Sequence, residues 1–445
     1  MHCKKLLTWL LVLCMMVSLV APAAVAATAS TDQGSVSAGQ KPSVNNSLMA
    51  NGSTSRPTLR DFMENLVTGN WSATKVENPG VGSMASASLS DTLDELKKAA
   101  QMYDENDIVS AFVVMEQAPL VTLFNSITDV DAAKAALLQQ QQNALVDRIE
   151  SEVLSGDDLD VQHQFTYLTN SIVVNTAFGN LEKIAKLSGV KTVFLTPVYE
   201  ACEPQDITYP NTISSGYMSN VYEVWAEQLG YTGKGMTIAI LDTGLDTDHP
   251  SFAADPQLGA TSWDKEFVAS MMEKLNAFEL YPDLTVDDLY YSAKIPFAFN
   301  YGDQGAFPLT VDHSDGIGDH GTHVAGISAA NDVEGSGVVG MAPDAQIIVM
   351  KVFSQAGGAY LYDILNALED AMTLGCDVAN LSLGSAAGFS TASEEIMEIY
   401  ERIAETDIIV NIAAGNEGPS SLDNIPQTHL NPTTHPDNAP IPLYM

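Results

Sequence analysis

The chain has 445 residues, 46% of them hydrophobic, and it carries 56 acidic against 19 basic side chains, a formal net charge of −37 at pH 7. This length allows two or three domains with sizeable cores, and the apolar fraction excludes a wholly disordered chain. So negative a charge argues against nucleic acid or an anionic membrane surface as a partner, and four cysteines are too few for a disulfide scaffold.

Residues 1–27 have the pattern of a secretory signal peptide. Lys4 and Lys5 precede an apolar run over 6–20, and the small-residue pattern Ala24-Val25-Ala26 follows. The run is shorter than the ~20 residues that a membrane span needs, and no later segment is long and apolar enough to span. We therefore expect an exported protein without a transmembrane segment in its mature form.

The composition of residues 28–92 is rich in Ser, Ala, Thr, Asn and Gly, which predicts a low-complexity linker with one short helix near 59–67. Apolar periodicity then predicts a β-α-β-β-α-β run, which is the order of a small ferredoxin-like α+β domain, assigned here to residues 93–203. The expected elements are a strand at 108–115, a helix at 129–154, strands at 161–168 and 172–177, a helix at 181–187 and a strand at 190–195.

The remaining residues, 204–445, alternate short, almost wholly apolar segments with amphipathic ones. This pattern predicts an α/β domain whose parallel sheet is covered by helices on both faces. In such sheets the chemistry lies at the carboxyl ends of the strands. The expected strands are 236–241, 346–353, 378–383 and 408–413, and the expected helices are 322–330, 360–374 and 394–404.

A first motif, Ile240-Leu241-Asp242-Thr243-Gly244, follows one of these strands. The sheet edge would hold the Asp242 carboxylate rigidly, and Gly244 would let the chain turn away. An aspartate in an ordinary turn is the plainer interpretation. Asp-Thr-Gly is also the motif of aspartic proteases, but that mechanism needs two carboxylates, and the sequence contains no second Asp-Thr-Gly or Asp-Ser-Gly.

A second motif, running from Gly318 to Gly326, places small residues around His320 and His323 at the start of a helix. The His320 imidazole would face a neighbouring strand end and take up a proton, while His323 would be a packed supporting residue. Two histidines three residues apart could instead bind a metal. Zinc-binding helices, however, use i, i+4 spacing and a third ligand, so no metal site is predicted.

A third motif, Ala413-Ala414-Gly415-Asn416-Glu417-Gly418, follows the last predicted strand. An asparagine held between glycines at this edge can direct its amide N–H toward a developing oxyanion. By itself, an asparagine in a turn explains the motif equally well.

Taken in order, the three motifs resemble those of the subtilisin-like serine protease family (peptidase S8). The resemblance covers about 235–418 and includes Gly340-Met341-Ala342-Pro343 and Asn380-Leu381-Ser382-Leu383-Gly384. It implies that Asp242 orients the imidazole, that His320 is the general base and then the general acid, and that Asn416 donates to the oxyanion.

The resemblance also implies how peptide would bind. Ser382, Leu383 and Gly384 would pair with an extended substrate by strand addition, and Ala413, Ala414 and Gly415 would form a wall of the first specificity pocket. The ferredoxin-like domain resembles the family's inhibitory propeptide, which makes this domain an intramolecular partner in addition to peptide substrates.

Two further features bear on location and cofactors. The long stretch between Asp242 and His320 is similar to the large surface-protease branch of Gram-positive bacteria, which implies a secreted or cell-surface protein. Some relatives carry a calcium-binding aspartate directly after His-Pro, whereas Ser251 follows His249-Pro250 here. No cofactor is therefore assigned, and calcium is left without a site.

The family's nucleophile is missing from the expected motifs. Its serine lies in Gly-Thr-Ser-Met-Ala-x-Pro, which does not occur in the sequence; the look-alike Gly82-Ser83-Met84-Ala85 lies in the linker and lacks the Thr and the Pro. We therefore expect a secreted protease precursor truncated before its serine, with residues 105–200 still attached. The alternative is a catalytically inactive remnant or a peptide-binding protein.

Overall fold

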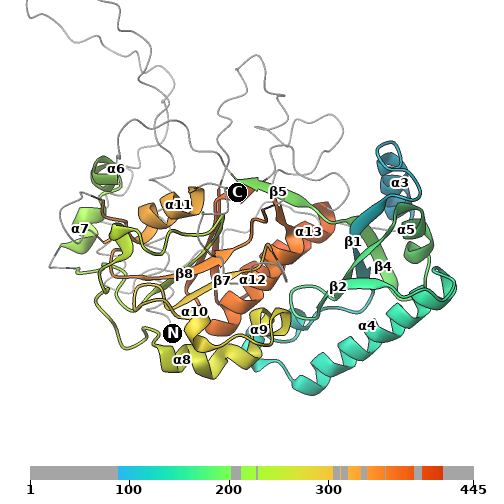
Figure 1. Ribbon diagram of the computed structural model, residues 1–445, viewed down its shortest axis with the longest axis horizontal. Helices are drawn as coiled ribbons and strands as arrows, with labels where there is room; N and C mark the ends of the chain where they lie inside the picture. The colour runs from blue at the N-terminus through green and yellow to red at the C-terminus, as the bar shows by residue number, and fades with distance from the viewer. Residues whose placement is uncertain are drawn as a thin grey trace, which may run out of the picture. The chain divides into compact units, whose positions relative to one another are not determined.

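The computed structural model of the chain describes residues 89–201, 212–226, 229–303, 311, 319–331, 338–355, 357–384 and 393–413 (Figure 1). All of these residues belong to one compact unit. The predicted signal peptide and the helix near 59–67 lie outside the described residues. Within the described ranges, no helix has the length and apolar character that crossing a membrane requires.

The first sheet is antiparallel, with the strand order β2-β3-β1-β4. Its elements confirm the predicted β-α-β-β-α-β order, and helix α3 precedes them. This helix begins at Leu89, four residues before the predicted start of the domain at residue 93. Its buried face includes Leu96 and Ala99. The bounds are α3 Leu89–Ala99, β1 Ile108–Met115, α4 Ala132–Glu152, β2 Asp160–Phe165, β3 Ser171–Ala177, α5 Phe178–Ala185 and β4 Val190–Leu195.

Strand β1 shows why this sheet does not stand alone. Ala111 and Val113 pack into the core formed with α3, α4 and α5, whereas Phe112 and Val114 on the opposite face belong to a second core. A strand alternates its side chains between two faces, so both faces of this sheet are apolar. The second face must therefore be covered by another part of the chain.

The second sheet is parallel, with the order β12-β10-β6-β8-β7, which confirms the predicted α/β domain. The sequence analysis did not predict β7, a four-residue strand at the sheet edge. The strands are β6 Thr237–Asp242, β7 Phe297–Asn300, β8 Gln346–Lys351, β10 Val378–Leu381 and β12 Ile409–Ile412. The helices are α6 Thr212–Met218, α7 Val221–Trp225, α8 Lys265–Met271, α9 Asn276–Leu280, α10 Val286–Leu289, α11 His320–Ala329, α12 Leu361–Leu374 and α13 Ser393–Ala404.

Helices cover both faces of the parallel sheet. Along β6, Ile238 and Ile240 pack into the core that contains Val324 of α11, while Ala239 and Leu241 pack into the core that contains α12 and α13. That second core also contains the outer face of the first sheet. In Figure 1, α12 and α13 accordingly lie between the parallel strands and β1–β4. These two helices thus supply the cover that the ferredoxin-like sheet lacks.

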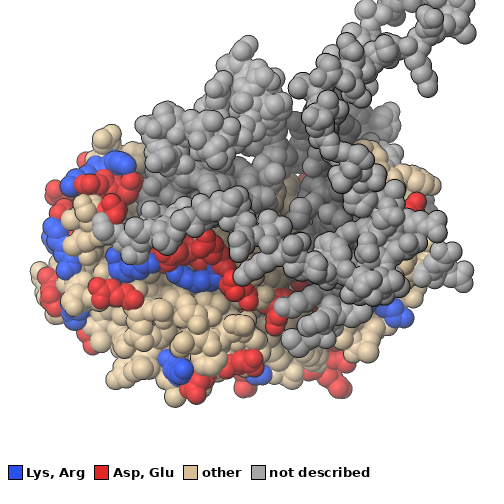
Figure 2. All heavy atoms as spheres, turned by 180° about the vertical axis from the view of Figure 1, so that it is seen from behind, with Lys and Arg blue, Asp and Glu red and all other residues tan. Residues whose placement is uncertain are grey.

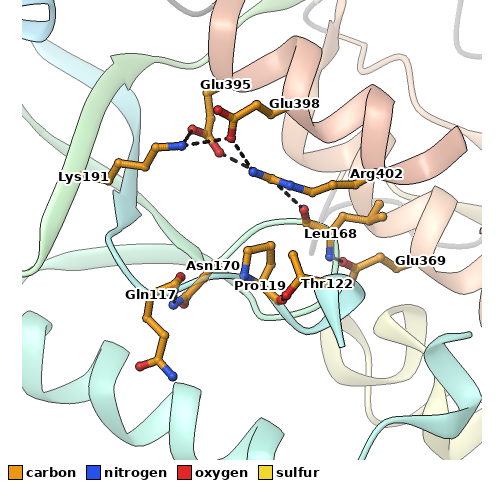
Figure 3. A network of polar contacts seen from close by, with 10 residues as sticks. All are labelled: Gln117, Pro119, Thr122, Leu168, Asn170, Lys191, Glu369, Glu395, Glu398 and Arg402. Atoms are coloured by element: carbon orange, nitrogen blue, oxygen red, sulfur yellow. Dashed lines mark hydrogen bonds and ion pairs between the residues drawn. The ribbon is translucent and has the colours of Figure 1, made fainter. Parts of the chain in front are cut away.

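Charged side chains join the same surfaces (Figure 3). The Lys191 ammonium of β4 lies 2.6 Å from Glu395 and 2.9 Å from Glu398 on α13, and Arg402 lies 2.5 Å from Glu398. The side chain of Glu395 is only 5% exposed. An ion pair so shielded from water is screened less than a surface pair.

The turn between β2 and β3 is held from both helices. The Leu168 N–H donates to Glu369 of α12 at 3.0 Å, and the Leu168 carbonyl accepts from Arg402 of α13 at 3.1 Å (Figure 3). Burial raises the pKa of Glu369 to about 7, although the Leu168 N–H opposes this rise. Leu168 is fully buried, and both its N–H and its carbonyl are therefore satisfied by side chains of α12 and α13, the helices that cover the parallel sheet.

A third, small antiparallel sheet has the order β11-β5-β9, where β5 is Val198–Ala201, β9 is Ala359–Tyr360 and β11 is Leu383–Gly384. One expectation is corrected here. The predicted strand 378–383 is divided at Ser382, because the chain leaves the parallel sheet there. Strand β5, which the sequence analysis did not predict, begins directly after Pro197. Segments from both halves of the chain build this sheet.

The outer surface carries both charge signs. On the face that Figure 2 shows, blue Lys and Arg atoms lie among red Asp and Glu atoms across the described surface. Although the chain is strongly acidic in total, several of its basic side chains form ion pairs with acidic ones, as Lys97 does with Asp94 and Lys186 with Glu182.

Candidate active site

The site begins where β6 ends and α11 starts. Asp242, the last residue of β6, is fully buried, and its Oδ1 lies 2.7 Å from Nδ1 of His320, the first residue of α11. A carboxylate can only accept hydrogen bonds, so Nδ1 carries the hydrogen of this contact. The proton chemistry of the ring therefore falls to Nε2. The structure brings together the aspartate and the histidine that the sequence singled out.

Backbone groups fix this pair in place. The Thr243 N–H donates to Asp242 Oδ1 at 2.7 Å, and the Thr243 hydroxyl accepts from the Gly321 N–H at 3.0 Å. Asp242 Oδ2, by contrast, is a buried oxygen without a hydrogen-bond partner among the described residues. Oδ1 is thus the oxygen that holds the imidazole in a single orientation.

Two glycines allow the strand end and the helix to approach each other. Gly244 has φ +110°, and a Cβ there would lie 2.2 Å from the Val311 carbonyl oxygen. A Cβ on Gly321 would lie 2.1 Å from the Gly244 oxygen and 3.1 Å from Asp242 Cβ. A side chain at Gly321 would push the helix away from the strand, and a side chain at Gly244 would collide with the backbone at Val311. The glycine predicted to turn the chain after Asp242 does so.

His323 lies on the same helix, and its N–H donates to the Asp319 carbonyl at 3.0 Å. Burial, and to a lesser extent the nearby His320, lowers the pKa of His323. His323 is an exposed residue of the helix, which differs from the packed supporting residue that the sequence predicted. Among the residues that the structure describes, no three His, Cys, Asp or Glu side chains are grouped as metal ligands would be.

The predicted peptide-binding residues lie beside this pair. Ser382 follows β10, the sheet neighbour of β6, and Leu383 and Gly384 form β11. The register pairs Leu383 with Ala201 and Gly384 with Glu200, so β11 already holds an extended strand. The Ala413 N–H donates to the Leu381 carbonyl at 3.0 Å. Ala414, Gly415 and Asn416 lie outside the described residues, so the predicted oxyanion donor remains a prediction.

Strand β5 lies in a slot between β11 on one side and β9 on the other. The sequence analysis did not predict the β9 side of this slot. Strand β9 pairs with β5 through Tyr360–Val198 and Ala359–Tyr199. Gly358, with φ +79°, precedes it, and a Cβ there would lie 2.4 Å from Val198 Cγ1. The consecutive glycines at 357 and 358 were the available signal, since close backbone approach requires residues without a Cβ.

Comparison with known proteins agrees with this geometry. Residues 233–439 match the Subtilase family (peptidase S8), and this part of the chain is a subtilase domain. The chain is 30% identical over 338 residues to the PII-type proteinase of Lactococcus lactis subsp. cremoris, covering 73% of this chain and 16% of that protein. It is 29% identical over 283 residues to subtilisin E of Bacillus subtilis, covering 63% of this chain and 58% of that protein. The chain thus spans less than two thirds of these relatives.

Among solved structures, fervidolysin from Fervidobacterium pennivorans, described as a keratinolytic enzyme related to subtilisin, aligns with a TM-score of 0.41 and 17% identity. That alignment covers 70% of this chain and 40% of fervidolysin. The assignment to the subtilisin-like serine protease family rests on the sequence relatives and on the site itself.

Proposed function

We propose that this chain supplies the aspartate and the histidine of a secreted serine-type endopeptidase that hydrolyses peptide bonds. The observation that carries this proposal is the 2.7 Å contact between buried Asp242 and His320, next to a slot that holds an extended strand. A histidine oriented by a buried carboxylate is the arrangement that activates a hydroxyl nucleophile.

The reaction divides into proton transfers at one nitrogen. His320 Nε2 takes the proton of a serine hydroxyl as its oxygen bonds to the peptide carbonyl carbon, and then gives that proton to the leaving amine as the C–N bond breaks. Asp242 stabilises the imidazolium between these two steps. Water then attacks the acyl ester, and the same nitrogen accepts and returns a proton. We assign no serine of the printed sequence to the nucleophile.

We further infer that the predicted ferredoxin-like domain, residues 93–203, acts as an inhibitory propeptide. Strand β5 lies in the slot that an extended substrate would occupy, paired on one side with β11 and on the other with β9. The domain that carries β5 is anchored to α12 and α13 through Leu168 and Lys191. A substrate would have to displace β5 before it could pair with the same strands.

The test is peptide hydrolysis by the full-length gene product. We expect His320→Ala to lower kcat/KM by about 10⁴-fold or more, since the base acts together with its nucleophile. His323→Gln, a substitution on the same helix, is the matched control and should leave most of the activity. Hydrolysis that His320→Ala leaves unchanged would contradict the proposal and favour a peptide-binding protein.

A further inference from the structure

Two buried asparagines lie side by side on the parallel strands β10 and β12, where apolar side chains are usual. Asn380 of β10 and Asn411 of β12 are register partners and are 3% and 5% exposed. Strands that are buried on both faces are normally built from Val, Ile and Leu. This pair is therefore a local departure from the pattern of the sheet.

The two side chains form a relay that ends at the peptide-binding segment. Asn411 Nδ2 donates to Asn380 Oδ1 at 2.8 Å, and Asn380 Nδ2 donates to the Ser382 hydroxyl at 3.0 Å. Ser382 is itself only 4% exposed. The first hydrogen bond thus joins β12 to β10, and the second joins Asn380 to the residue that follows β10 at the carboxyl edge of the sheet.

Such a relay is costly to bury. An amide without a hydrogen bond costs about 1–3 kcal/mol, while a pair of packed apolar side chains needs no partner at all. A buried polar network that breaks the local pattern is expected where a site has to be held in one geometry. The position of Ser382, the last residue of the relay, shows which part of the site the relay would hold.

Ser382 is the hinge between two sheets. One residue earlier, Leu381 pairs with Leu241 in the parallel sheet, and one residue later, Leu383 pairs with Ala201 of the bound strand. Asp242 follows Leu241 in the same way that Ser382 follows Leu381, so the hinge lies beside the catalytic aspartate. A rotation of the backbone at Ser382 would therefore turn β11 relative to Asp242.

Asn411 ties the carboxyl end of β12 to this hinge. It lies two residues before Ala413, whose N–H donates to the Leu381 carbonyl at 3.0 Å. The relay therefore connects the carboxyl ends of β12 and β10 through side chains, while the Ala413–Leu381 bond connects them through the backbone. The two links together fix the spacing between Ala413 and Ser382.

We propose that Asn380 and Asn411 are positioning residues that set the direction of the peptide-binding strand β11 through Ser382. The inference rests on the proposed function, because it assumes that peptide substrates use the slot which β5 now fills. It assigns to two residues with no role in the chemistry the task of holding a substrate's backbone in register with His320.

The experiment measures backbone hydrogen exchange of the intact chain in segments 198–201 and 382–384. In Asn411→Leu and in Asn380→Leu, we expect protection of both segments to fall at least tenfold, because each change breaks the relay. Asn331→Leu is the matched control: it also removes one asparagine hydrogen bond, to the Ala254 carbonyl, but Asn331 follows the end of α11 and takes no part in the relay. It should leave the slot protected.

The double variant Asn380→Leu plus Asn411→Leu separates positioning from packing. Two apolar partners should restore stability toward unfolding in urea, since no unpaired amide remains. The Ser382 hydroxyl would still have lost its donor, so we expect slot protection to stay low in spite of recovered stability. A stable double variant with wild-type protection of 382–384 would overturn the inference. These readouts do not depend on hydrolysis, so a failure of the proposed function would be seen separately, in the His320→Ala assay.

Discussion

Gly321→Ala is the substitution that tests the active-site geometry most directly. The added Cβ would lie 2.1 Å from the Gly244 oxygen, whereas real Cβ contacts essentially never fall below 3.0 Å, so helix and strand must separate by about 0.9 Å. If that shift falls along the Asp242–His320 contact, the 2.7 Å bond lengthens to about 3.6 Å, beyond the hydrogen-bond range. Forcing an atom into such a site costs about 1–3 kcal/mol.

Two measurements follow from this geometry. The hydrogen on His320 Nδ1 should give a separate proton resonance in the wild-type chain, and Gly321→Ala should abolish it. The free energy of unfolding in urea should fall by the overpacking cost. The matched control is Gly326→Ala on the same helix, where a Cβ would meet nothing within 4 Å. Alanine favours a helix over glycine by roughly 0.5–1 kcal/mol, so the control should be neutral or slightly stabilising. A Gly321→Ala chain that behaved like this control would refute the close-approach argument.

Three further outcomes are expected. Lys191→Met should lower the free energy of unfolding in urea by about 1–3 kcal/mol, because it leaves the shielded Glu395 without this ammonium. Lys186→Met, the control, breaks an exposed ion pair and should lower the same free energy by less than about 1 kcal/mol. Burial lowers the pKa of Lys294 to about 7 from 10.5, so the folded state must bury a charge below pH 7. The free energy of unfolding of Lys294→Met relative to wild type should therefore be highest at pH 6 and should fall as the pH rises to 10; a difference that is constant with pH would contradict this reasoning. Burial also raises the pKa of the Cys376 thiol, so mass-mapped alkylation at pH 8 should label Cys376 in urea but not in the native chain, and rapid native labelling would show the thiol to be accessible.

The elements that sequence analysis found are those with a strong local period. Strand β1 was predicted with its observed bounds, and α12 to within one residue, because apolar residues recur along each segment. The short strands β5, β9 and β11 were missed. Each has only two to four residues and exists because of a distant partner, as when Leu383 pairs with Ala201. No window along the sequence contains both members of such a pair.

The same distinction applies to the site. Asp242 and His320 could be predicted because each stands in a motif of glycines and small residues that is visible locally. The link between Asn380 and Asn411 could not, since it depends on the register of β10 against β12, and the sequence does not state that register. Asparagine in a strand is ordinarily a sign of an edge or a turn, so its local signal pointed away from the core.

The strand in the slot has a consequence for any peptide that approaches this protein. Because β5 is tethered to the same chain, it competes at an effective concentration that does not change when the protein is diluted, and for short tethers this concentration is of the order of millimolar. A free peptide at a lower concentration must therefore bind the slot more tightly than β5 does in order to displace it. Otherwise it can bind only after the tether has been cut. In the intact chain, a peptide would have to compete with the tethered strand β5 for the same hydrogen-bonding edges.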